Sequence, residues 1–181
     1  MERVASTSTV LLALDSPVRG RAYPQGMTDS TSVTPSTCPA CGTTGKPVKP
    51  ITLKALLTPG ALSTLEPGAP YRFCPDAGCD MVYFAEGCTY GRADVKVRIY
   101  QKDAGADVPV CSCFAHTRAD LEVAVLERRA ERVTQSIRGH IQAGRCGCEV
   151  NNPQGSCCLG NVTRFVAGVL DVERAGSGGV S

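Results

Sequence analysis

The sequence contains no tryptophan, and only nine of its 181 residues are aromatic, five tyrosines and four phenylalanines. Hydrophobic residues still make up 43% of the chain, which is enough to form a hydrophobic core. Because so few of them are large, we expect two cores of modest size rather than one large core.

A strong charge of one sign is also missing. Nineteen lysines and arginines almost balance seventeen acidic residues, giving a formal net charge of +2. This balance gives no electrostatic case for nucleic acid or an anionic membrane as a partner. No apolar run approaches the roughly 20 residues that a membrane-spanning helix needs. The short run at residues 10–14 lacks a basic flank and a small-residue cleavage site, so we expect no signal peptide.

Cysteine, by contrast, is abundant, with eleven residues in the chain. An odd number of cysteines without a secretory segment does not favour a complete set of disulfides, which is the alternative interpretation. In the reducing cytoplasm, where we expect this protein, clustered thiols are typical metal ligands. There are only two histidines, and we find no nucleophile-elbow, phosphate-loop or paired-carboxylate signature. We therefore do not expect an enzyme, beyond a metal-reducing redox activity of a bound group.

The composition divides the chain into four parts, and the fold class expected is α+β. Residues 1–34 are rich in Ser, Thr, Pro and Gly and are expected to be disordered, and residues 173–181 to form a flexible tail. Residues 35–105 predict a small β-rich unit with strands at 81–85 and 95–100, followed by a linker at 102–108. Residues 106–172 predict a helical hairpin.

The hairpin prediction rests on one capping pattern and two apolar series. Thr117 and Asp120 form the pattern that starts a helix. Apolar residues spaced by multiples of four then predict one long helix that ends near Gly144; they are Leu121, Val125, Val133, Ile137 and Ile141. A loop at residues 151–155 leads to a second helix, whose apolar positions are Val162, Phe165, Val166 and Val169.

The first block contains two cysteine pairs, Cys38 with Cys41 and Cys74 with Cys79. A close pair supplies two thiolates at little cost in chain entropy, and two pairs complete the tetrahedral shell of a structural zinc. The 32 residues between the pairs leave room for a β-hairpin. A redox C-x2-C motif with unrelated buried cysteines is the alternative, and a histidine or another thiol could replace Cys79 as the fourth ligand.

The second block contains six cysteines in three groups: Cys111 and Cys113, Cys146 and Cys148, and Cys157 and Cys158. Two cysteines separated by one residue cannot both bind one zinc comfortably, but they suit adjacent positions around a [2Fe–2S] cluster, which needs four thiolates. Each group precedes a helix, whose positive end favours an anionic cluster. The spacing alone does not decide which four of the six are ligands.

Two segments carry a resemblance to a known family. C-S-C-F-A-H-T at residues 111–117 and C-G-C-E-V-N-N-P-Q-G-S-C-C-L-G-N-V at residues 146–162 resemble the iron–sulfur domain of CopZ-type copper chaperones, and more distantly bacterioferritin-associated ferredoxins. The segments C-P-A-C and F-C-P-D-A-G-C-D-M-V-Y-F resemble the zinc-binding domain of the same family. The resemblance implies zinc ligands Cys38, Cys41, Cys74 and Cys79, and cluster ligands Cys111, Cys113, Cys148 and Cys158. Cys146 and Cys157 stay close competitors for the last two positions.

The resemblance implies a metallochaperone or accessory protein for heavy metals, with copper favoured and mercury as an alternative. Its cluster would reduce Cu(II) to Cu(I), its cargo would be a soft metal ion, and a metal-transporting ATPase or a redox partner would be its protein partner. CopZ-type proteins also carry a heavy-metal-associated domain with an M-x-C-x2-C loop. The printed sequence contains no such loop, so we expect a stand-alone form. A ferredoxin-like electron-transfer protein and a cluster-based redox sensor remain the alternative functions.

Overall fold

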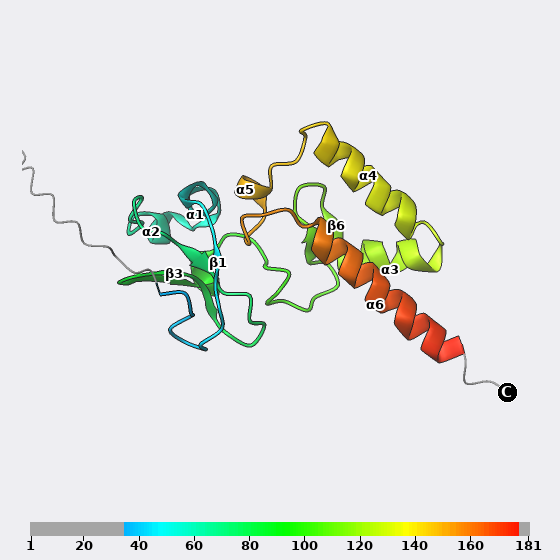
Figure 1. Ribbon diagram of the computed structural model, residues 1–181, viewed down its shortest axis with the longest axis horizontal. Coiled ribbons are helices and arrows are strands. Elements are labelled where there is room, and N and C mark those ends of the chain that lie inside the picture. The colour runs from blue at the N-terminus through cyan, green and yellow to red at the C-terminus, as the bar shows by residue number, and fades with distance from the viewer. Residues whose placement is uncertain (1–34, 178–181) are drawn as a thin grey trace, which may run out of the picture. The chain divides into compact units, whose positions relative to one another are not determined.

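The computed structural model describes residues 35–177 (Figure 1). The expected disorder of residues 1–34 and the end of the expected tail, residues 178–181, lie outside this range. The fold is α+β, as predicted: a four-stranded antiparallel sheet is followed by a largely helical region. We describe the residues before and after about 105 as the sheet half and the helical half.

The sheet has the strand order β1-β2-β3-β4, with every neighbouring pair antiparallel. The strands are β1 (Lys46–Pro47), β2 (Arg72–Phe73), β3 (Met81–Ala85) and β4 (Cys88–Gly91). The predicted strand at 81–85 is confirmed with the same bounds, and its residues 82–85 are all buried. A 3-10 turn, η1 (Arg92–Asp94), follows β4.

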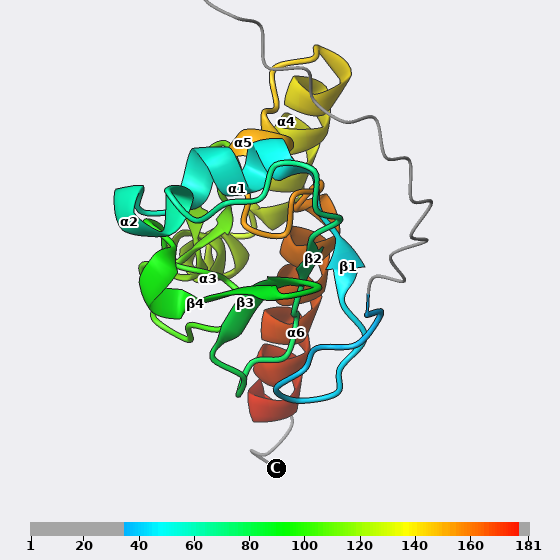
Figure 2. The same cartoon turned by 90° about the vertical axis from the view of Figure 1, so that its left-hand side faces the viewer.

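Two helices, not a β-hairpin, form most of the ordered structure in the chain between the two cysteine pairs of the sheet half. They are α1 (Pro50–Leu56) and α2 (Pro59–Leu62), and each begins at a proline. Proline has no backbone N–H and a fixed φ, so it suits the first turn of a helix. The helices lie along one side of the sheet (Figure 2), where buried leucines of α1 join the core that contains Tyr71, Phe73 and Val82.

The predicted strand at residues 95–100 is wrong. This segment meets the chain after α1 through one isolated bridge, between Val95 and Leu57, and then turns. Val95 and Ile99 are buried as expected, but Val97 between them is 41% exposed, so the side chains do not alternate. The backbone N–H of Lys96 bonds to Leu56 O at the end of α1, which takes the segment away from the sheet edge.

The expected linker at residues 102–108 is an ordered turn. Lys102 is only 6% exposed, and Val108 is fully buried. The carboxylates of Asp103 and Asp107 both accept hydrogen bonds from Arg98. The segment therefore packs into the fold and does not act as a solvated tether.

The helical half begins with a two-stranded ladder, β5 (Pro109–Cys111) and β6 (His116–Thr117). The predicted start of the first helix is confirmed, since Thr117 and Asp120 form a capping box at α3 (Arg118–Leu126). Its predicted end is confirmed too: α4 (Ala130–Gln142) stops just before Gly144, which takes the left-handed φ of +67° typical of a helix terminus.

The prediction of one continuous helix between these ends is wrong, because the chain breaks at residues 127–129. Arg128 has a left-handed φ of +55°, which no helix residue adopts. The apolar series that predicted one helix has an arginine at 129, where the next apolar side chain was due. Without an apolar group there to hold the chain in the core, the break lets α3 and α4 each pack on the final helix.

The final helix confirms the predicted second helix and is longer than expected. A short turn of helix, α5 (Cys148–Asn151), and a loop precede α6 (Leu159–Ser177), so residues 173–177 of the expected tail are helical. Val162 of α6 is fully buried with Leu121 and Ile137 in a second core. The structure thus has the two modest main cores that the composition predicted. Within residues 35–177, no helix has the length and apolarity required to cross a membrane.

Candidate metal centres

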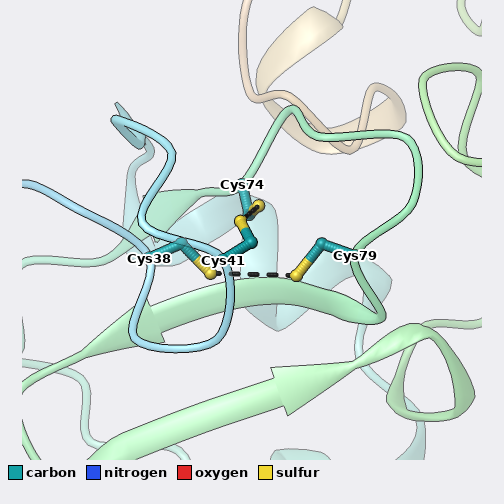
Figure 3. Close-up of side chains that lie close together, drawn as sticks. All are labelled: Cys38, Cys41, Cys74 and Cys79. Atoms are coloured by element: carbon teal, nitrogen blue, oxygen red, sulfur yellow. Dashed lines mark hydrogen bonds between the residues drawn. The ribbon is translucent and has the colours of Figure 1, made fainter.

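The four cysteines of the sheet half lie at one point of the fold (Figure 3). Their sulfur atoms all lie within 4.8 Å of one another. The Sγ–Sγ distance is 3.9 Å between Cys38 and Cys79, and 3.6 Å between Cys41 and Cys74. A tetrahedron with Zn–S bonds of about 2.3 Å has sulfurs about 3.8 Å apart. These four thiols therefore have the spacing that a structural zinc requires.

Each pair is placed by a different local structure. Cys38 and Cys41 lie on a tight turn, closed by hydrogen bonds from Cys38 N to Thr43 O and from Gly42 N to Cys38 O, both 2.8 Å. Cys74 directly follows β2, and its N–H bonds to Val82 O in β3. Cys79 lies in the loop that leads into β3. The sheet thus fixes one pair, and the turn brings the other pair to it.

The electrostatic surroundings of the four thiols differ. A hydrogen bond from the Thr43 side chain, helped by the Thr43 backbone, lowers the pKa of the exposed Cys41 to about 6. Burial raises the pKa of Cys74 to about 12, and it also raises the pKa of Cys79. Without metal, only Cys41 of these three is readily ionised at neutral pH. The two buried thiols need a cation beside them to lose their protons.

A buried lysine supplies positive charge at this site. Lys102 Nζ donates to the carbonyl oxygen of Asp76 at 2.7 Å and to that of Cys79 at 3.0 Å, so it binds the loop that carries two of the cysteines. Its charge also lowers the pKa of Cys74, against the larger effect of burial. Four thiolates exceed the charge of one Zn²⁺ by two, and a nearby ammonium group offsets part of that excess. The sequence gives no sign of this role, since Lys102 lies in the segment predicted to be a linker.

The four cysteines of the helical half that the resemblance implied form two close pairs. The Sγ atoms of Cys113 and Cys148 are 3.6 Å apart. Cys111 and Cys158 are close enough for each thiol to shift the pKa of the other, and Cys148 and Cys113 also act on the pKa of Cys158. Cys111 and Cys158 are almost fully buried and belong to the second core. The four come from β5, the turn after it, the start of α5 and the residue before α6.

Two of these sulfurs, those of Cys111 and Cys148, have backbone amide donors. Cys111 Sγ accepts hydrogen bonds from Cys158 and from the N–H groups of Phe114 and Cys113, which lower its pKa to about 6. Burial raises the pKa of Cys148 to about 12, although the N–H of Cys158 bonds to its sulfur. The hydrogen bond to Cys111 and burial raise the pKa of Cys158. Buried thiols with amide donors fit an iron–sulfur cluster, whose sulfurs accept such bonds.

The loop between Cys148 and Cys158 is held by the sheet half. The Tyr83 hydroxyl of β3 donates to Pro153 O at 2.8 Å, and Asn152 and Gln154 are only 4% and 5% exposed. Gly155 has a φ of +65°, and a Cβ there would lie 3.1 Å from both Thr52 Oγ1 and Val48 Cγ1. Only glycine fits this position without strain. The N-P-x-G segment that carried the family resemblance is therefore part of the contact between the two halves.

The three remaining cysteines lie in two places. Cys88, at the start of β4, contacts the hydroxyl groups of Tyr71 and Tyr90. Cys146 and Cys157 line one open hollow of about 570 Å³, together with Cys148. His116 is half-buried and pairs with Cys111 in the β5–β6 ladder, and the His140 ring stacks on Phe114. Neither histidine is part of the four-sulfur group of the sheet half.

Comparison with known proteins agrees with this geometry. A family model of the CopZ type, described as a zinc binding domain, matches residues 35–96. The copper chaperone CopZ of Archaeoglobus fulgidus is 32% identical over 130 residues, which is 71% of this chain and 60% of that protein. The chain thus spans less than two thirds of that relative's length.

The X-ray structure of the N-terminal domain of A. fulgidus CopZ is similar in fold. It aligns with a TM-score of 0.61 and 30% identity, over 71% of this chain and 96% of that domain. The match therefore takes in almost all of that domain, well beyond the zinc-binding segment. From the four-cysteine site, the sheet and the following helices, this chain belongs to the CopZ family, as a homologue of its N-terminal region with the zinc-binding domain.

Proposed function

We propose that this chain is an iron–sulfur-cluster-binding metallochaperone or accessory protein for heavy metals, with copper as its cargo. The observation that carries the proposal is the closeness of Cys113 to Cys148 and of Cys111 to Cys158. Cys111 and Cys158 lie in the second core, Cys113 packs against it, and backbone N–H groups donate to the sulfurs of Cys111 and Cys148. We assign these four as the ligands of a [2Fe–2S] cluster, and residues 106–172 as the domain that binds it.

The cysteines of the sheet half have a structural role in this proposal. We assign Cys38, Cys41, Cys74 and Cys79 as the zinc ligands, and residues 35–105 as the zinc-binding domain. A closed set of four thiolates leaves no open position for cargo, which is the property of structural zinc sites. Two residues connect the sheet half with both sites. Lys102 binds the loop that carries Cys79, and Tyr83 binds the loop between Cys148 and Cys158.

When bound, a [2Fe–2S] cluster supplies one electron, which is the amount that converts Cu(II) to Cu(I). The chain's own residues would hold that group between Cys113 and Cys148, which are half-buried, and Cys111 and Cys158, which are buried. Thiolates are soft ligands and bind Cu(I) in preference to Cu(II). We place this activity in the cytoplasm, where thiols stay reduced.

The proposal is tested by metal analysis, visible absorption and EPR of anaerobically purified protein. We expect about two iron, two sulfide and one zinc per chain. Serine substitution of Cys111, Cys113, Cys148 or Cys158 should remove the iron and keep the zinc, and Cys88→Ser should keep both. A colourless protein that folds without iron would disprove the cluster assignment.

A ferredoxin-like electron-transfer protein is the second candidate, because the same helical domain serves that role equally well. The two functions differ in cargo. Reversible reduction of the cluster in a protein that takes up no copper would favour electron transfer, and copper uptake by the protein with its cluster in place would favour the metallochaperone.

A further inference from the structure

The hollow beside Cys148 has the properties of a second metal site. Its walls include Cys146, which is half-buried, and Cys157, which is exposed. Both thiols therefore reach the same open space of about 570 Å³ from different segments, one before α5 and one before α6.

The other groups around the hollow favour a soft cation. Ile141 and Val150 give it apolar walls, and none of the described residues that line it is basic. Glu149 carries its only carboxylate, and Lys49 Nζ binds that group at 2.6 Å. The thiols are therefore the donors left for a metal. Thiolates are soft ligands that favour Cu(I). Two thiolates are too few for a structural zinc, which requires four ligands.

We propose that Cys146 and Cys157 bind one Cu(I) ion in this hollow, next to the cluster ligand Cys148. This inference rests on the proposed function, because it takes Cys148 and Cys158, not Cys146 and Cys157, as the cluster ligands. It gives the cargo a position: copper is bound beside the group that supplies its electron. It also gives a role to two of the three cysteines that neither the zinc nor the cluster uses.

The test is an anaerobic titration of the full chain, with zinc and cluster in place, with Cu(I) against a chromogenic Cu(I) chelator. We expect one Cu(I) per chain with iron and zinc retained. Cys146→Ser and Cys157→Ser should each lower the Cu(I) affinity by more than about 100-fold, since even an outer partner of a metal ligand is worth 10–100-fold. Cys88→Ser, which removes the third spare thiol away from the hollow, should leave the affinity unchanged.

Four results would overturn the proposal. The first is unchanged Cu(I) affinity in both hollow variants. The second is copper uptake that occurs only as zinc leaves, which would place the copper at the other four cysteines. The third is loss of iron from Cys146→Ser or Cys157→Ser, which would make that residue a cluster ligand. A cluster that is intact in all variants without any Cu(I) binding would disprove this site and leave the cluster assignment standing.

Discussion

The hydroxyl group of Tyr83 donates a hydrogen bond to the carbonyl oxygen of Pro153, across 70 residues of sequence. Tyr83 is in the central part of the sheet and is fully buried, and burial raises the pKa of its hydroxyl group. The hydroxyl therefore stays protonated and remains a donor over the physiological pH range. Its acceptor lies in the loop that separates Cys148 from Cys158, so the sheet half contributes directly to the position of the proposed cluster ligands.

Tyr83→Phe should loosen this loop. Removing the hydroxyl leaves the buried Pro153 carbonyl without its donor, which costs about 1–3 kcal/mol of unfolding free energy. We expect faster release of iron to a chelator than from the original protein. Tyr90→Phe, a buried tyrosine of the same sheet that does not bond to the loop, is the matched control. Equal iron-release rates in the two variants would contradict the role given to Tyr83.

Gly155→Ala tests the same loop from its backbone. An alanine would have to adopt the left-handed φ of +65°, at a cost of about 1–2 kcal/mol, and its Cβ would press on Val48 and Thr52. The midpoint of chemical unfolding should fall accordingly. Gly168→Ala in α6, where an added Cβ meets nothing within 4 Å, should instead gain about 0.5–1 kcal/mol. A neutral effect of Gly155→Ala would show that the loop is not seated as described.

Much of this architecture could be predicted from the sequence, because the signals were local. Strand β3 follows from a run of aromatic and β-branched residues, the start of α3 from its capping box, and the four-cysteine site from two close pairs. The prediction failed where a distant contact decides the conformation. The apolar residues of segment 95–100 suit a strand, yet the segment binds the end of α1 through Lys96 and turns inward at Ile99.

The lysine at the zinc-binding loop is a second case of this kind. Nothing near Lys102 in the sequence separates it from a solvated linker residue, since its partners Asp76 and Cys79 lie more than twenty residues away. Similarly, the break at Arg128 is visible in the sequence only as a missing apolar side chain at 129. Each of these features depends on tertiary packing, which a pattern of neighbouring residues does not contain.

Lys102→Met should weaken zinc binding. The methionine keeps the volume but removes the charge beside the thiolates, leaves the Asp76 carbonyl without this donor, and leaves the Cys79 carbonyl with Arg92 as its remaining donor. We expect a loss of about 10–100-fold in zinc affinity, the range found for outer partners of metal ligands. Competition with a zinc chelator measures this directly. Lys96→Met, at an exposed lysine of the same segment, should leave the affinity unchanged.

Thr43→Val should move the pH at which zinc is released. The Thr43 hydroxyl is the largest of the causes that lower the pKa of Cys41 to about 6. Without it the pKa rises, so protons compete with zinc at higher pH. We expect the midpoint of zinc release to rise by roughly half a pH unit, since one hydrogen bond is worth about 1 kcal/mol.

The control for this titration is Thr44→Val, because Thr44 is the adjacent threonine and is exposed. Its release midpoint should match that of the unaltered protein. If both threonine variants shift equally, then the effect belongs to the turn as a whole and not to the hydrogen bond on Cys41.

The packing of Gly155 also has a consequence for the order in which the new protein folds and takes up metal. Val48 and Tyr83, which receive the loop, belong to the core of the sheet half, and Cys74 of the four-cysteine site bonds to strand β3 of the same sheet. Until the sheet half has folded, the loop between Cys148 and Cys158 lacks the surface on which it packs. Newly synthesised protein should therefore acquire zinc first and iron second, and cells starved of zinc should accumulate the protein without its iron.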